Sequence, residues 1–226
     1  MQVNAYLAIS ALANVCEMFT TGVTPENITA LIQRIPKELN MNSSQDAAKV
    51  VTNGLACVAA FARLEEDSYS PLASAFLEQD ALSVALKFVN SPVPTLRAAA
   101  CEAVCALASN RLVDFKAPAV IQGATTSLMS SVTSYATAAG HMHANVLSLL
   151  GIGMLLQMDD AAQECIASSS PDVGVLLGYM RQHEDGDLQI LASDIFSVLV
   201  QKHKDKVAQT MRFAQKNMDA NLKYTT

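Results

Sequence analysis

The chain has 226 residues, of which 51% are hydrophobic and 16% charged, and glycine and proline together supply only sixteen (9 + 7). This composition excludes a disordered or collagenous chain and is sufficient for a sizeable core. A net charge of −6 argues against a nucleic-acid-binding protein, whose affinity depends on neutralising phosphates. The longest apolar run, 146–158, is too short and interrupted for a bilayer span of about 20 residues, so we expect no membrane span.

The cysteine count indicates the redox compartment of the protein, and the absence of known motifs indicates which catalytic and ligand-binding chemistry to exclude. Five cysteines form an odd number and no export leader opens the chain, so we expect reduced thiols in a cytoplasmic or nuclear protein. Cys101 and Cys105 lie one helical turn apart, but no histidine or carboxylate at a matching spacing completes a zinc site. No phosphate-binding loop, dinucleotide fingerprint or nucleophile motif occurs. We therefore predict no metal, no cofactor and no catalytic residues.

Helical periodicity runs through the whole chain, and strict strand-like alternation is absent. Helix starts are marked by cap-plus-proline pairs such as Thr24-Pro25 and Ser170-Pro171, and the Pro92–Pro94 loop breaks a helix. These signals predict an all-α fold. The expected helices span 3–20, 25–35, 44–63, 68–79, 80–90, 95–110, 116–122, 124–136, 141–157, 160–168, 171–182, 187–201 and 204–219.

An apolar stripe with spacings of four, four and three residues begins at Leu96 and recurs from Leu188, 92 residues later (188 − 96). Half of that offset, 46 residues, places further copies near residues 4, 50 and 142. Each stripe occupies one face of a helix. A period of this length with three helices predicts a right-handed α-solenoid of about five repeats. We expect a single repeat domain over 1–226, closed by a capping helix over 204–219.

Three segments carry a family resemblance. Residues 76–86, followed by 92–96 and Ala100, are similar to the second helix, loop and third helix of the armadillo-repeat family. Residues 120–124 resemble the Gly-Ala junction between its first and second helices, and 11–15 resemble the end of its third helix. HEAT repeats share the period and the packing, so the sequence leaves the subtype open.

The resemblance implies a binding protein whose third helices line a concave groove for peptides or helices. In the peptide-binding members this groove carries a ladder of Trp and Asn, whereas this chain has no Trp and keeps only Asn14 of the Asn positions. This departure argues against a nuclear import role. We therefore predict a non-enzymatic protein-binding scaffold, adaptor or structural subunit. The alternatives are an armadillo-type nucleotide-exchange co-chaperone of a heat-shock chaperone and a regulatory domain of a larger enzyme.

The register of the stripes predicts the positions that line the groove, which lie three, six and ten residues after each stripe start. They include two acids and no base, so we expect a partner protein that presents a cationic or amphipathic peptide or helix. The predicted positions are Leu7, Ser10, Asn14, Asn53, Ala56, Ala60, Ala99, Glu102, Ala106, Asn145, Ser148, Ile152, Leu191, Asp194 and Val198.

The two ends of the chain are expected to differ. The sequence begins almost directly on a predicted third helix, so Leu7 and Ile9 are predicted to form an association surface for a second copy or a partner. At the other end, 204–219 has an apolar side that includes Val207 and a polar side that includes Lys206, as a terminal cap requires.

Overall fold

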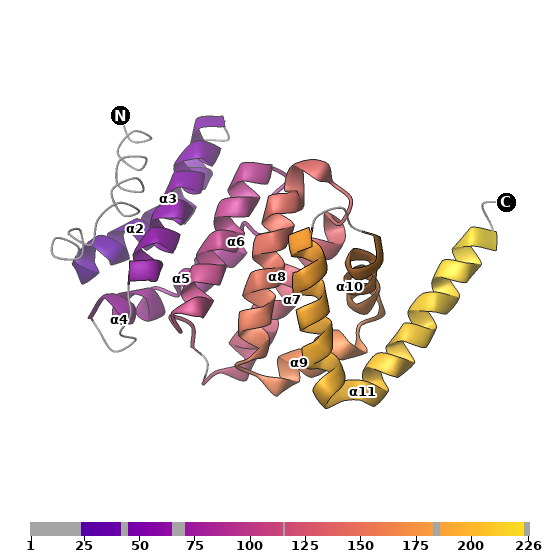
Figure 1. Ribbon diagram of the computed structural model, residues 1–226. Coiled ribbons are helices and arrows are strands. Elements are labelled where there is room, and N and C mark those ends of the chain that lie inside the picture. Colours follow the sequence, from indigo (N-terminus) through magenta and orange to yellow (C-terminus); the bar gives the residue numbers. More distant parts are fainter. Residues whose placement is uncertain (1–23, 42–44, 65–70, 115, 183–185, 224–226) are drawn as a thin grey trace. The chain divides into compact units, whose positions relative to one another are not determined.

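The computed structural model describes residues 24–41, 45–64, 71–114, 116–182 and 186–223 (Figure 1). Every regular element in these ranges is a helix, so the all-α prediction is confirmed for them. The helix predicted over 3–20, with its proposed association surface at Leu7 and Ile9, lies outside the described residues. The helices group into two compact units that divide between Lys116 and Ala117.

In the first unit, the described residues within 24–114 form two long helices, two short ones and a third long one. Thr24 and Asn27 start the first helix by exchanging hydrogen bonds between side chain and backbone, with Pro25 at the first helical position. Pro94 has the same role in the last helix. The elements are α2 (Pro25–Met41), α3 (Gln45–Leu64), α4 (Pro71–Glu78), α5 (Ala81–Leu86) and α6 (Pro94–Ser109).

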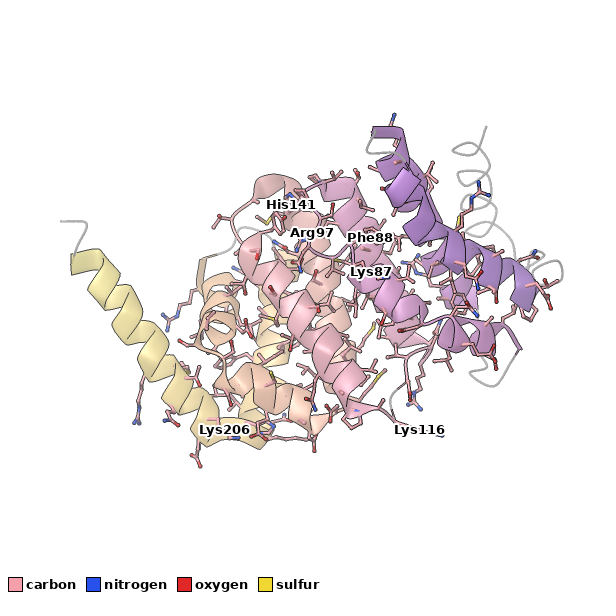
Figure 2. All side chains as sticks on the ribbon, turned by 180° about the vertical axis from the view of Figure 1, so that it is seen from behind. Lys87, Phe88, Arg97, Lys116, His141 and Lys206 are labelled. Atoms are coloured by element: carbon pink, nitrogen blue, oxygen red, sulfur yellow. The ribbon has the colours of Figure 1, made fainter. Side chains whose placement is uncertain are left out.

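Helix α2 packs against α3, α4 and α5, and α6 packs against α3 and α5. The side chains of Val50 and Cys57 in α3 are buried together with the partly buried Leu31 and Phe61. Arg97 in α6 is fully buried, and its Nε donates to the Val89 carbonyl at 3.2 Å (Figure 2). This bond fixes the start of α6 against the turn that follows α5.

The second unit begins with a long helix and ends with the longest one. The Asp159 carboxylate caps α9 by accepting hydrogen bonds from the backbone N–H groups of Ala161 and Ala162. Helix α7 packs against α8, α9 and α10, and α11 packs against α8, α9 and α10. The elements are α7 (Pro118–Ser134), the short 3-10 helix η2 (Ala139–His141), α8 (Met142–Leu156), α9 (Asp160–Ser168), α10 (Ser170–Gln182) and α11 (Gly186–Lys223).

The two units have the same internal order of helices. Among the residues that the structure describes in each unit, two long helices are followed by two shorter ones and then by a long one, so α2 to α6 correspond to α7 to α11. Every helix–helix contact of the first unit has a counterpart in the second: α2 with α3, α4 and α5 corresponds to α7 with α8, α9 and α10. The contacts of α6 with α3 and α5 correspond to those of α11 with α8 and α10.

The positions of the buried residues show which residues of the two units correspond to each other. Leu96, Ala100, Ala103 and Leu107 in α6 match Leu188, Ala192, Ile195 and Leu199 in α11 at an offset of 92 (188 − 96). Val51, Leu55, Val58 and Ala62 in α3 match Asn145, Leu149, Ile152 and Leu156 in α8 at an offset of 94 (145 − 51). Each of these sixteen side chains is at most 5% exposed, so the alignment rests on burial and not on residue identity.

The predicted break between 116–122 and 124–136 is wrong, because α7 runs without interruption from Pro118 to Ser134. Gly123 lies on the exposed side of this helix, and nothing lies within 4 Å of the position that a Cβ would take. A single glycine in a helix interior weakens the helix by roughly 1 kcal/mol and does not end it. The predicted Gly-Ala junction is therefore helix interior.

The stripe predicted from residue 142 does not coincide with the buried face of α8. Met142 and Val146 are partly exposed and Leu150 is 36% exposed, whereas Leu149 and Ile152 are fully buried. Apolar residues surround α8 on nearly all sides, so their spacing does not identify the face that packs. In α3, α6 and α11 the stripes that begin at 50, 96 and 188 lie mainly in the interior.

The segment predicted as a separate cap, 204–219, continues α11 across a kink at His203, whose backbone is not helical. On both sides of the kink, side chains hold α11 against α9. Lys202 and Lys206 pair with Asp160 and Glu164, and the Thr210 hydroxyl donates to the Ala167 carbonyl at 2.8 Å. The kink at His203 separates 186–201 from 204–219, as the two predicted helices require, and the capping role of the second stays a prediction.

Candidate functional site

The correspondence between the units identifies a surface where they differ in chemistry. Ala56 on α3 and Ala98 on α6 are partly buried in the first unit. At the matching positions the second unit has Leu150 on α8 (56 + 94) and Ile190 on α11 (98 + 92), with exposed fractions of 36% and 61%. A large apolar side chain that remains in solvent contributes little to folding. These two replacements therefore point to a role outside the core.

We call this the α8–α11 surface and define it by Leu150, Ile190, Leu191, Asp194 and Val198. Helices α8 and α11 contact each other and lie side by side (Figure 1). Leu191 and Val198 are partly exposed, and Asp194 is exposed. The surface combines an apolar strip with one carboxylate, which is the composition of a protein-binding patch.

The carboxylate of this surface differs from its counterpart in the first unit. Glu102 on α6 forms an ion pair with Arg63 on α3, with 2.6 Å between Oε1 and Nη2. The register places Asp194 at the position of Glu102 (102 + 92) and Gln157 at the position of Arg63 (63 + 94). Gln157 has no charge and cannot form an ion pair with a carboxylate, and Asp194 has no ion-pair partner among the described residues.

The structure distributes the predicted groove residues between surface and core. Leu7, Ser10 and Asn14 lie outside the described residues. The side chains of Ala60, Ala99, Ala106, Asn145, Ser148 and Ile152 are buried, so they leave no surface for a ligand. Asn53, Ala56, Glu102, Leu191, Asp194 and Val198 are at least partly exposed. Of these, Leu191, Asp194 and Val198 come together on α11.

Hydrogen bonds explain why the polar groove candidates on α8 face inward. Asn145 Nδ2 donates to the Tyr135 carbonyl at 3.0 Å and to the Tyr179 hydroxyl at 3.1 Å. Ser148 Oγ donates to the Ala144 carbonyl of its own helix at 2.7 Å. Because buried polar groups need such partners, Asn145 and Ser148 have structural roles.

The residues that the sequence reasoning missed are Leu150 and Ile190. Leu150 belongs to the stripe assigned to the core, and Ile190 lies two residues after the start of another stripe. The sequence did contain a signal for these two residues. When α3 is aligned with α8 at an offset of 94 residues, Leu150 corresponds to Ala56, and when α6 is aligned with α11 at an offset of 92 residues, Ile190 corresponds to Ala98. The offset of 92 residues is visible in the sequence, whereas the offset of 94 residues between α3 and α8 became visible only from burial.

Burial lowers the reactivity of two of the cysteines that the structure describes. Burial raises the pKa of the Cys57 thiol to about 12, and burial is also the main reason that the pKa of Cys105 is raised to about 11. Cys165 on α9 is exposed, with its sulfur 3.9 Å from the Thr126 hydroxyl. Within the described ranges, no three His, Cys, Asp or Glu side chains are grouped so that they would hold a metal ion.

No protein-family model matches the chain, and no curated protein sequence matches it. In the part of the chain that the structure describes, none of the helices is both long and apolar enough to span a membrane.

Proposed function

We propose that this protein is a non-enzymatic binding module of the armadillo/HEAT type that captures a partner protein through the α8–α11 surface. The observation that supports this proposal is the replacement of Ala56 and Ala98 by the exposed Leu150 and Ile190 at matching positions. Two exposed large apolar residues on neighbouring helices raise the risk of aggregation unless a partner covers them. Protein-binding hot spots have this character.

The helix order supports the repeat part of the proposal. The described part of each unit has a helix pair followed by a helix triplet, and HEAT and armadillo repeats have two and three helices with a period near 40–47 residues. We propose that the chain combines both types in a right-handed solenoid of stacked repeats. Free cysteines at positions 57, 101, 105 and 165 are consistent with a reducing compartment, and the proposal places the protein in the cytoplasm.

Site-specific photo-crosslinking tests the proposal. A photoreactive phenylalanine analogue is placed at Leu150 or Ile190, and at Ala56 or Ala98 as matched controls in the first unit. After irradiation in an extract of cells that express the protein, we expect Leu150 and Ile190 to give adducts of the same mass and the controls to give none. Adducts of equal yield from both units, or no adduct from either, would contradict the proposal.

A further inference from the structure

The ion pair between Arg63 and Glu102 shows what the second unit lacks. In the first unit the carboxylate on the closing helix is neutralised within the chain by a guanidinium from α3. In the second unit Gln157 replaces that guanidinium, while the carboxylate is retained as Asp194. Helix α8 and residues 186–201 contain no Lys or Arg and two acids, Asp187 and Asp194. The α8–α11 surface is therefore complementary to a positive charge.

The backbone of α8 and α11 restricts the form of the partner. In a helix interior the N–H and C=O groups are already bonded within the helix, so they offer no ladder to an extended strand. On α11, Val198 occupies the position at which the resemblance would place a backbone-clamping Asn. A helical ligand needs no such clamp, because its own backbone groups are paired. Two adjacent helices with exposed apolar side chains match the helix-in-groove mode of recognition.

We propose that the occupant of the α8–α11 surface is a cationic amphipathic helix of a partner protein. Its apolar residues cover Leu150 and Ile190, and its Lys or Arg supplies to Asp194 the charge that Arg63 supplies to Glu102. A second copy docked through the same surface is disfavoured, because such an interface would contain two copies of Asp194 and no Lys or Arg from α8 or residues 186–201. This inference rests on the proposed function and adds the chemistry of the partner.

Two synthetic helices of 18 residues serve as probes. One has Leu on one face and Lys on the other, and its counterpart has Glu in place of Lys. In fluorescence anisotropy at low ionic strength, we expect the Lys helix to bind at least about tenfold more tightly than the Glu helix. The difference should shrink at 0.5 M salt because screening weakens exposed charge pairs. Equal binding of the two helices, or preference for the Glu helix, would overturn the charge assignment.

Gln157→Arg is the decisive variant, since it restores within the second unit the cation that the first unit has. We expect Gln157→Arg and Asp194→Asn each to weaken binding of the Lys helix about three- to tenfold. Glu102→Gln in the first unit is the control and should leave the affinity for the Lys helix unchanged. Circular dichroism and thermal unfolding verify that each variant is folded. Binding of the Lys helix that is unaffected by both Gln157→Arg and Asp194→Asn would overturn the inference.

The apolar variants separate this inference from the proposed function. If Leu150→Ala and Ile190→Ala weaken both helices while the charge variants have no effect, the surface binds ligands but the cation assignment is wrong. If no variant in the second unit changes binding, both proposals fail. Light scattering tests whether a second copy of this chain covers the surface instead. If the protein is a dimer and Ile190→Ala dissociates it, a second copy is the occupant and this inference is wrong.

Discussion

Asn145 on α8 and Tyr179 on α10 are joined by a hydrogen bond of 3.1 Å from the amide Nδ2 to the phenol oxygen, and both side chains are buried. The Tyr179 hydroxyl also lies 3.4 Å from the Ala136 carbonyl, and Asn145 Nδ2 reaches the Tyr135 carbonyl. One amide and one phenol thus link α8, α10 and the segment after α7. The two side chains satisfy carbonyls that the end of α7 leaves without helical partners.

Removing either side chain should destabilise the fold. Tyr179→Phe deletes the hydroxyl but leaves Asn145 bonded to Tyr135, so we expect a loss of about 1–2 kcal/mol in the free energy of unfolding. Asn145→Ala removes both hydrogen bonds of the buried amide and leaves a small cavity in its place, and should cost about 2–3 kcal/mol. Urea unfolding measures both values. Asn53→Ala, at a partly exposed position of α3, is the control and should change stability by less than about 0.5 kcal/mol.

Two glycines in helix interiors should respond in opposite ways to alanine. A Cβ at Gly54 would lie 2.9 Å from Ile35 Cγ1, a contact that real Cβ atoms essentially never make, so Gly54→Ala should destabilise the protein by about 1–3 kcal/mol. At Gly123 nothing lies within 4 Å, so Gly123→Ala should stabilise it by up to about 1 kcal/mol through helix propensity. Thermal unfolding of the two variants compares them directly. A destabilising Gly123→Ala would contradict the continuous helix α7.

Cysteine labelling should separate the exposed thiol from the buried ones. We expect iodoacetamide at pH 8 to modify Cys165 in the native protein, whereas Cys57 and Cys105 are shielded and remain protonated, with pKa values of about 12 and 11. Peptide mass spectrometry identifies the labelled sites, in a Cys16→Ser background that removes the thiol outside the described residues. Cys165→Ser should then abolish labelling of the folded chain, and unfolding in urea should restore it at the buried thiols.

Asp172 in the first turn of α10 should make stability depend on pH. Burial raises the pKa of its carboxyl above the ordinary value, and a hydrogen bond with the Ser169 side chain opposes this only in part. The folded state therefore binds the proton more tightly than the unfolded chain does. Its stabilising effect is complete below the ordinary aspartate pKa and is lost as pH rises through the raised value.

The Asp172→Asn variant tests this sign. The variant should gain stability relative to the parent as pH rises from about 3.5 to 7, since the asparagine does not ionise, and the difference should level off at both ends. Urea unfolding at a series of pH values measures the difference. Asp194→Asn, at an exposed carboxylate, shows how much of any change comes from net charge alone. A gain that is the same at every pH would contradict the assigned sign.

The sequence alone determined which segments form helices, because helix formation depends on local signals. Pro94 and Asp159 mark helix starts that are visible in the sequence and present in the structure. The recurrence at 92 residues was also visible, since it survives as apolar identities at Leu96 and Leu188. These features depend on residues within one or two turns of each other.

Only the tertiary structure decided which face of each helix is buried. Helix α8 is apolar on nearly all sides, so the spacing of its residues fits more than one face, and packing against α7 and α11 selects the one with Leu149 and Ile152. The same packing turns Asn145 inward and leaves Leu150 exposed. The surface is defined by what the neighbouring helices leave uncovered, and that depends on contacts between residues far apart in the chain.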